Sequence, residues 1–417
     1  MKKILATILA LVMALGLTAT VWAADVSGST STKAAKIGDT EYDTLQAAIN
    51  AASDGGNTVV VLLNDLTESI TVAKEKSITL DLSGYTLTNE AGKHTITNYG
   101  DLTITSTGVV DNVSHACAAL VNKEGATAEL NGGSFTRSKE NGQSKEDSGG
   151  NSYYNIQNFG KMTINDGVLV KQDGGFSSMV ANGYYDGTNK TNTPTLIING
   201  GKFIGGLNTI KNDDCGKLTI NNGVFENVEQ HAVFNVNEAE IKGGTYAMDG
   251  NDSVLYNRKY NDTNDKGLLT VEGGTFTAKD GVPTIKVYDE NSKPTVTGGA
   301  FSSDVSAYAT EGTAVASLKG VYYVGAANIE SAVNSMNGGD TLTVVKGEVT
   351  INGTKYSKES NVTYTKPTSY YYYSPSTTTP DTTTKGSPKT FDAGVGIYAV
   401  TAVLSVTGMA WTAKKRH

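Results

Sequence analysis

The chain has 417 residues, of which 47 are glycine, and carries a formal net charge of −8. An acidic surface repels phosphate groups, so this charge argues against nucleic acid or an anionic membrane as the main partner. The two cysteines and the four histidines are scattered along the chain, so we predict neither a metal site nor a cofactor.

Residues 1–24 have the pattern of a secretion signal. Lysines at positions 2 and 3 precede an apolar run over 4–22, and the small residue Ala23 then stands at a position suited to cleavage. No basic stop-transfer segment follows this run, so we expect the protein to be exported.

Residues 37–63 predict a short amphipathic helix followed by a strand. Asp43 and Gln46 are spaced as a capping box, which favours a helix start at this point. The apolar run Val59–Leu63 is typical of a strand. Four apolar residues between them recur at helical spacing, namely Leu45, Ala48, Ile49 and Ala52.

A short sequence recurs seven times in the middle of the chain. In each copy apolar and other residues alternate, a glycine follows, and a large apolar residue stands two positions later, as in 218–225. The alternation predicts a strand with one buried face, and the glycine predicts a sharp bend. The glycines are Gly133, Gly167, Gly201, Gly223, Gly244, Gly274 and Gly299. The large residues after them are Phe135, Leu169, Phe203, Phe225, Tyr246, Phe276 and Phe301. The apolar residues three positions before them are Leu130, Ile164, Ile198, Ile220, Ile241, Val271 and Val296.

Successive glycines are separated by 34, 34, 22, 21, 30 and 25 residues, which indicates a repeat architecture. One coil of a parallel β-helix needs only about 20 residues, because it consists of two or three short strands and their turns. The two shortest intervals fit such a coil, and the longer ones predict loops that leave it. We therefore predict an all-β parallel β-helix over 37–325, with the helix of 37–63 covering its open end.

A second landmark supports the solenoid. Six times an apolar residue stands two positions before an asparagine, which predicts a further strand ending in an asparagine turn. Stacked asparagines can form a hydrogen-bonded ladder along the axis. The pairs are Ile96 and Asn98, Leu120 and Asn122, Ile156 and Asn158, Val180 and Asn182, Ile210 and Asn212, and Leu255 and Asn257.

Cys117 and Cys215 are separated by three of the glycines, which places them at least three coils, about 14 Å, apart in a β-helix. A disulfide requires Cα atoms within about 7 Å of each other. We therefore expect two unpaired thiols.

Residues 326–365 resemble the segment 37–63 in their pattern. Asn328 is placed to cap a helix, and a strand is expected at 342–345. The unit is expected to cap the C-terminal end of the solenoid or, alternatively, to start a second solenoid that does not continue. The expected apolar helix face consists of Ile329, Ala332, Val333 and Met336.

Residues 366–390 predict a linker without a core, because they hold four of the seven prolines and many threonines and tyrosines. An apolar run of 21 residues follows over 393–413, and the chain ends on the basic residues 414–416. The run is long enough to span a bilayer, and the basic end is expected on the cytoplasmic side.

The order of motif, apolar run and basic end in 387–417 resembles the cell-wall sorting signal of Gram-positive surface proteins. In that family a sortase cuts after the threonine of a short motif and joins it to peptidoglycan. Phe391 stands where the family has glycine. The resemblance implies a chain held at the cell surface, either linked to the wall or, without cleavage, anchored in the membrane through 393–413. The motif residues are Ser387, Pro388, Lys389 and Thr390.

The repeat segment resembles the pectate-lyase-like right-handed β-helix found in adhesin-like surface proteins of Gram-positive bacteria. The resemblance rests on the general pattern of 37–325. It implies a surface-displayed protein with a face for a polysaccharide or a host surface glycoprotein.

Some relatives of this fold are polysaccharide lyases or glycoside hydrolases, so such an activity is the alternative, and a structural wall spacer is a third. The chain has neither the Gly-His-Gly nor the Arg-Ile-Lys element of polygalacturonases, so we predict no catalytic residue. The charged groups considered for chemistry are Asp213 with Asp214, Arg258 with Asp262 and Asp265, and the histidines His115 and His231.

Two insertions, 183–195 and 258–267, each follow a landmark asparagine, so we expect both on one edge of the solenoid, about 14 Å apart. The insertion 137–152 follows Phe135 and is expected on a different edge. Exposed tyrosines present flat apolar faces with a hydroxyl, which suits stacking on sugars or contact with a protein. The predicted binding residues are Tyr184, Tyr185, Asp186, Tyr256, Arg258 and Tyr260.

Overall fold

The computed structural model describes residues 33–140, 153–172, 177–259 and 265–363. The predicted signal peptide, the linker 366–390 and the sorting signal 387–417 lie outside these residues. Among the helices of the described part, none is long and apolar enough to cross a membrane.

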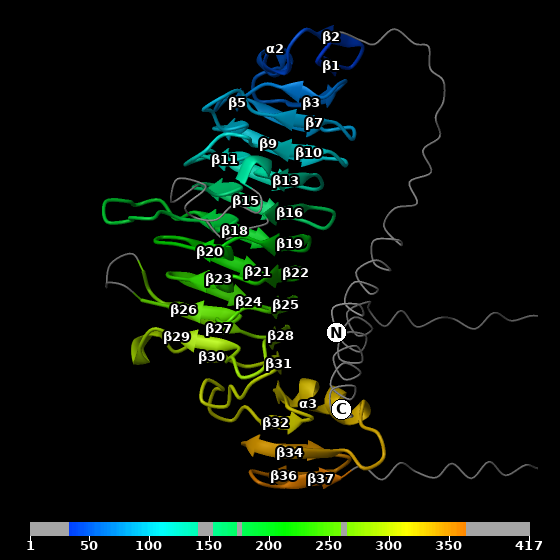
Figure 1. Cartoon of the computed structure of the whole chain (residues 1–417), viewed down its shortest axis with the longest axis vertical. Helices are drawn as coiled ribbons and strands as arrows, with labels where there is room; N and C mark the ends of the chain where they lie inside the picture. Colours follow the sequence, from blue (N-terminus) through cyan, green and yellow to red (C-terminus); the bar gives the residue numbers. More distant parts are fainter. Residues whose placement is uncertain (1–32, 141–152, 173–176, 260–264, 364–417) are drawn as a thin grey trace, which may run out of the picture. The chain divides into compact units, whose positions relative to one another are not determined.

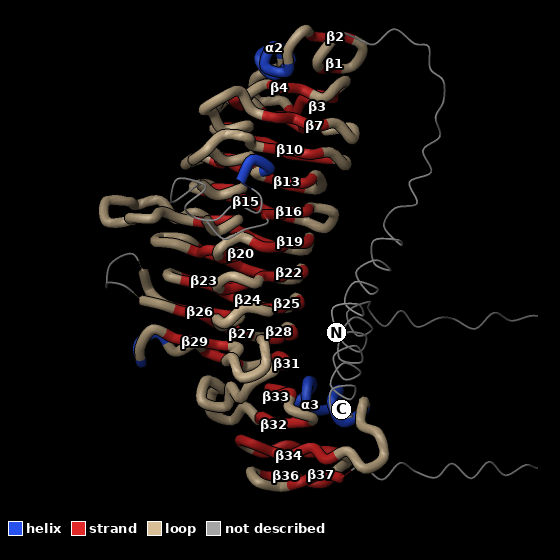
Figure 2. Tube along the Cα trace, viewed as in Figure 1, coloured by secondary structure: helices blue, strands red, loops and turns tan. Residues whose placement is uncertain are grey.

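The described chain is a right-handed parallel β-helix, which confirms the predicted fold class (Figures 1 and 2). Each coil gives one strand to each of three sheets that run along a common axis. The coil 195–212, for example, consists of β18 (Thr195–Ile198), β19 (Lys202–Gly205) and β20 (Asn208–Asn212). The turn from β18 to β19 contains the repeat glycine, and β20 ends on the landmark asparagine.

The strands of the described residues fall into three large sheets and one hairpin. The twelve-stranded sheet contains, in spatial order, β2 (Thr40–Tyr42), β1 (Ala35–Ile37), β3 (Asn57–Leu62), β6 (Ser77–Asp81), β9 (Asp101–Thr105), β12 (Thr127–Leu130), β15 (Lys161–Ile164), β18, β21 (Lys217–Ile220), β24 (Glu238–Ile241), β27 (Leu268–Val271) and β30 (Thr295–Val296). The fourteen-stranded sheet contains β37 (Asn361–Thr363), β34 (Thr341–Lys346), β32 (Val315–Leu318), β33 (Val321–Val324), β31 (Gly299–Phe301), β28 (Thr275–Ala278), β25 (Thr245–Met248), β22 (Val224–Asn227), β19, β16 (Leu169–Gln172), β13 (Ser134–Thr136), β10 (Val109–Asp111), β7 (Thr86–Thr88) and β4 (Leu66–Thr67). The nine-stranded sheet contains β29 (Ile285–Val287), β26 (Leu255–Asn257), β23 (His231–Asn235), β20, β17 (Val180–Asn182), β14 (Ile156–Asn158), β11 (Leu120–Asn122), β8 (Ile96–Asn98) and β5 (Ile70–Val72). The hairpin consists of β35 (Glu348–Ile351) and β36 (Thr354–Ser357), and the helices are α2 (Leu45–Ala51), α3 (Ala326–Asn334), η1 (Ser138–Glu140) and η2 (Glu290–Ser292).

The core is one continuous apolar column made by the inward side chains of all three sheets. Five rings stack face to face along it, with centroid separations of 4.6–4.9 Å, namely Phe203, Phe225, Tyr246, Phe276 and Phe301. The repeat glycines allow this stack. At Gly244 (φ 100°), for instance, a Cβ would lie 3.1 Å from the carbonyl oxygen of Gly223 in the preceding coil.

The prediction of the inward residue is wrong in one of the seven repeats. Leu169 is partly exposed, and Val170 takes the inward position between Phe135 and Phe203. The turn after Ile164 has one residue more than the equivalent turn after Ile198, and a shift of one residue moves the opposite face of a strand inward.

The landmark asparagines form a buried ladder, as predicted. Each side-chain amide except that of Asn257 at the end donates to the side-chain oxygen of the asparagine in the next coil, at 2.7–2.8 Å. Each also donates to a backbone carbonyl one coil further on, as Asn158 does to Thr195 O at 2.9 Å. The ladder includes Asn235, which the pattern analysis missed. Its members are Asn98, Asn122, Asn158, Asn182, Asn212, Asn235 and Asn257, all with 0% exposure.

The N-terminal unit covers the first coil, but its helix begins differently from the prediction. The N-cap is Thr44, whose Oγ1 accepts a hydrogen bond from Ala47 N at 3.0 Å, while Asp43 pairs with Lys33. Asp43 and Gln46 therefore form no capping box. Instead the Gln46 amide accepts from Thr71 N at 2.7 Å and donates to Thr71 O at 3.0 Å, which completes the outer edge of β5.

The C-terminal unit repeats the order of elements found at the N-terminus. There, the hairpin β1–β2 precedes α2, and β3 pairs antiparallel with β1. Here, the hairpin β32–β33 precedes α3, and β34 pairs antiparallel with β32. Strand β33 also pairs antiparallel with β31, which covers the last coil of the fourteen-stranded sheet.

The helix α3 has the predicted apolar face but not the predicted cap. Ile329, Ala332 and Val333 are buried. The N-cap is Gly325, and Asn328 lies within the first turn, where its amide donates to Val324 O at 2.8 Å.

Cys117 and Cys215 are both buried and are not bonded to each other. Cys117 precedes β11 and Cys215 follows β20, three strands further along the nine-stranded sheet. The coils are therefore not joined by this pair.

Replacing Phe225 with serine is expected to lower the free energy of unfolding by about 3–5 kcal/mol, because the ring is fully buried in the stack. The buried hydroxyl adds to the loss. Urea denaturation followed by far-UV circular dichroism measures the change. Val224→Ser, at the 38% exposed neighbour, is the control and should leave the transition nearly in place. Equal midpoints for the two variants would show that the stack contributes little.

Candidate functional site

The two predicted insertions leave the solenoid at the same edge, as expected. The loop 183–195 connects β17 to β18, and the segment 258–267 connects β26 to β27, so both join the nine-stranded to the twelve-stranded sheet. In Figure 1 the loop 183–195 projects to the left, as does the described chain on either side of 260–264. The insertion after Phe135 connects the fourteen-stranded to the nine-stranded sheet, and its residues 141–152 lie outside the described part.

The outer face of the nine-stranded sheet is divided into a covered and an open half. In its middle strands the outward residues Val121, Gln157 and Ala181 are at most 3% exposed. Tyr154 packs in this region, where burial raises the pKa of its phenol. From β20 onward the outward residues are accessible.

The open half carries a row of aromatic and cationic side chains, with one residue from each strand. Lys211 of β20 lies beside Phe234 of β23, which lies beside Tyr256 of β26 and then Lys286 of β29. Three further residues stand at the adjoining edge. Tyr185 and Arg258 come after ladder asparagines, and Tyr288 follows Val287, the strand neighbour of Asn257. We call the whole group the aromatic strip, and it consists of Tyr185, Lys211, Phe234, Tyr256, Arg258, Lys286 and Tyr288.

Lys211 holds the first part of the aromatic strip together. Its ammonium is 2.9 Å from Asp213 Oδ1, 5.4 Å from the ring centroid of Tyr185 and 5.9 Å from that of Phe234. Both distances to the rings fall within the range of cation–π attraction. Tyr185 is 87% exposed, so the rest of its ring is open to solvent.

Tyr256 is fixed between two coils. Its ring stacks on the buried His231 at 4.9 Å, meets Phe234 edge-on at 5.1 Å, and lies 5.7 Å from the Lys286 ammonium. Burial lowers the pKa of His231, whose Nδ1 contacts Ser253 O at 2.9 Å. The buried imidazole therefore supports the ring of Tyr256.

Arg258 and Tyr288 form the far end of the aromatic strip. The guanidinium carbon of Arg258 lies 4.2 Å from the ring centroid of Tyr288, which is 55% exposed. Tyr260, predicted to bind beside them, lies outside the described residues.

Tyr184 is not the exposed platform that we expected. It is 7% exposed, packs on Phe159 at 5.1 Å, and donates a hydrogen bond to Glu124 at 3.2 Å. Its backbone exchanges two hydrogen bonds with Asp214. Tyr184 thus anchors the loop that presents Tyr185, while Asp186 is exposed and accepts from Thr188.

The pair Asp213 and Asp214 has a structural role in the same loop. Burial raises the pKa of Asp213 to about 6 despite the nearby Lys211 ammonium. Burial also raises the pKa of Asp214, whose Oδ2 accepts from Gly187 N at 2.9 Å. Asp213 pairs with the Lys211 side chain, and Asp214 binds the loop backbone at Gly187. This arrangement is not that of an acid and a base facing a substrate.

The two histidines considered for chemistry lie apart in the fold. His115 is an exposed loop residue before β11, whereas His231 is buried in β23. Asp265 is 1% exposed, and Asp262 lies outside the described residues. Across 33–140, 153–172, 177–259 and 265–363, no group of three or more acidic, histidine or cysteine side chains is placed to hold a metal.

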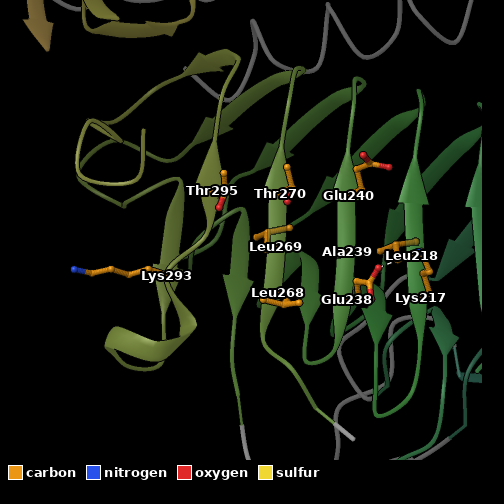
Figure 3. A pocket seen from close by; sticks show the side chains of 10 residues that line it. All are labelled: Lys217, Leu218, Glu238, Ala239, Glu240, Leu268, Leu269, Thr270, Lys293 and Thr295. Carbon is orange, nitrogen blue, oxygen red and sulfur yellow. Dashed lines mark ion pairs between the residues drawn. The ribbon is translucent and has the colours of Figure 1, made fainter. Parts of the chain in front are cut away.

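A shallow groove of about 360 Å³ lies on a different face, over β21, β24, β27 and β30 (Figure 3). Its charges are already paired. Glu238 lies 2.9 Å from Lys217 and 3.3 Å from Lys266, and these lysines lower its pKa. In Figure 3 Lys293 extends away from the groove. We therefore regard the aromatic strip as the better candidate for a binding site.

Sequence analysis missed Lys211, Phe234, Lys286 and Tyr288. The sequence does contain a signal for three of these residues. Lys211, Phe234 and Lys286 each stand between the inward apolar residue and the last residue of their strand, a position that the pleat turns outward. Tyr288 takes the place directly after its strand, equivalent to Arg258.

Comparison with protein-family models, with curated proteins and with solved structures finds no match to this chain.

The raised pKa of Asp213 predicts a pH-dependent stability. In the unfolded chain the carboxyl loses its proton near pH 3.8, but in the folded chain only near pH 6, so deprotonation in this window favours unfolding. Between about pH 4 and pH 7 the wild type should lose on the order of 3 kcal/mol relative to Asp213→Asn. Urea denaturation over this range measures the difference. Asp280→Asn, at an exposed carboxylate, is the control, and a wild-type profile parallel to that of Asp213→Asn would contradict the prediction.

Proposed function

We propose that this chain is a surface-anchored, adhesin-like β-helical protein that binds extracellular carbohydrate along the aromatic strip. The proposal is supported by the strip itself, because flat rings with hydroxyls and ammonium groups at fixed spacing suit the apolar faces and hydroxyls of sugars. The resemblance of the repeat pattern in 37–325 to pectate-lyase-like β-helices of Gram-positive surface proteins is consistent with this role.

The geometry favours binding over catalysis. The histidine closest to the strip is buried with its Nδ1 against Ser253 O, and the carboxylates at the edge of the strip hold Lys211 and the loop backbone. Polysaccharide cleavage stays as the alternative activity, to be tested beside binding. A wall spacer without a ligand is the third possibility.

The surface location is proposed from the sequence. An export signal at 1–24 and a sorting signal at 387–417 would make a sortase and peptidoglycan the partners that fix the chain to the envelope. The solenoid would then face the medium, where carbohydrate of the wall, of the surroundings or of a host surface glycoprotein is accessible.

The binding proposal predicts that Tyr185→Ala and Tyr288→Ala each weaken carbohydrate binding by about tenfold, a typical effect for an exposed aromatic anchor. The measurement is a glycan array with the full chain purified in detergent, followed by titration of the best glycan. An assay for new reducing or unsaturated sugar ends runs in parallel.

Tyr99→Ala is the matched control, because Tyr99 is 45% exposed at the same edge but lies at β8, four strands away from β20. Equal affinities of the wild type and both strip variants would refute the strip as the binding site. New sugar ends would favour the enzyme instead.

The anchoring proposal is tested by deleting 391–417, which should release the protein into the medium. Thr390→Ala should abolish linkage to the wall and leave attachment through the apolar run 393–413, because the threonine carbonyl is the group that a sortase transfers. Fractionation of medium, wall digest and membranes measures the distribution. If all wild-type protein is found in the detergent-soluble membrane fraction, the sortase step does not take place, and Phe391 is the residue to restore to glycine.

A further inference from the structure

The lysines of the aromatic strip are neutralised within the protein. Lys211 pairs with Asp213 at 2.9 Å, and Lys286 pairs with Asp252 at 3.1 Å. The Asp213 carboxylate is 7% exposed and Asp252 is 36% exposed, so the second pair in particular presents its negative partner to solvent. A ligand carboxylate or sulfate would have to displace these partners.

The cationic groups are also used to orient rings. Lys211 lies over Tyr185, Lys286 over Tyr256 and Arg258 over Tyr288. At Tyr185 and Tyr288 the cation holds the ring and leaves much of its surface exposed, whereas Tyr256 is also packed against His231 and Phe234. The strip is therefore built to present ring surface, and its cations serve mainly to hold that surface in place.

The direction of the strip follows from the register of the strands. Lys211, Phe234, Tyr256 and Lys286 are direct neighbours across four parallel strands. Neighbouring strands lie about 4.8 Å apart, so the row spans about 14 Å parallel to the solenoid axis. The most exposed rings, Tyr185 and Tyr288, stand at its two ends. An extended chain lying along the axis can contact both, whereas a compact ligand cannot.

The charge of the whole protein acts in the same sense. With a formal net charge of −8, the chain repels polyanions. The two lysines of the strip do not offset this repulsion, because each is paired with an aspartate.

We infer that the ligand is an uncharged linear polysaccharide that lies parallel to the solenoid axis over several sugar units. The inference rests on the proposed carbohydrate binding and adds the class and orientation of the ligand. Ring stacking and hydrogen bonds supply its affinity, so binding depends on chain length and hardly on salt.

The test is a titration of the full chain with two panels of oligosaccharides of matched length. One panel holds neutral chains (glucan, mannan, galactan and xylan), and the other holds acidic chains (galacturonate, alginate and hyaluronate). Each titration is done at about 0.05 M and about 0.5 M salt, which changes the Debye length from more than 10 Å to less than 5 Å. At least one neutral series should bind, gain affinity up to the length that covers both end tyrosines, and change by less than twofold with salt.

The outcomes separate this inference from the proposal on which it rests. An acidic series that binds more tightly than every neutral one, loses affinity at high salt and is weakened by Tyr185→Ala would overturn the inference and leave carbohydrate binding intact. Binding that is saturated by a monosaccharide would refute the extended orientation. If neither panel binds, or if Tyr185→Ala and Tyr288→Ala match Tyr99→Ala, both ideas fail. A Tyr185→Phe variant, which keeps the ring, should retain most of the affinity if stacking is the main contact.

Discussion

The buried asparagine ladder is the interaction on which the rest of the solenoid depends. A parallel β-helix must turn sharply three times in each coil, and a buried turn leaves backbone groups that need hydrogen-bond partners. At this edge an asparagine amide supplies them in the seven coils from β8 to β26, and in all but the last of these it also binds its neighbour in the next coil. Removing any amide would leave several buried groups unsatisfied, which makes the residue type at this position nearly fixed.

This constraint explains why the connections that follow the ladder can differ in length. The chain after each ladder asparagine starts from the same geometry, so it can be two residues long, as after Asn158, or twelve, as after Asn182, without a change in the following strand. The twelve-stranded sheet continues in register on both sides of these connections. The aromatic strip lies next to this edge, where loops and outward strand positions can change while the core is kept. Its rings are accordingly supported from the protein side by His231, Lys211 and Arg258 and not by the core.

The fold could be predicted because its signals are local and repeated. Period-two alternation, a glycine bend and an asparagine turn each reflect the backbone of a few residues, and seven copies make the pattern clear. The errors arose where one residue decided the outcome. A longer turn moved Val170 inward in place of Leu169, and Thr44 capped the helix in place of Asp43. The strip was only partly predictable, since the burial of Tyr184 depends on Glu124, sixty residues earlier, and no local pattern contains that contact.

The Gln46 amide at the first coil has a consequence for how copies of the protein behave toward one another. An open strand edge is a template on which a second chain can grow, and a solenoid built of parallel strands is exposed to this risk at both ends. By imitating a neighbouring peptide group, the glutamine satisfies Thr71 without offering a new edge of its own. Copies at high concentration would thus stay separate particles and not join end to end into fibres, and a single glutamine side chain is the barrier at that sheet.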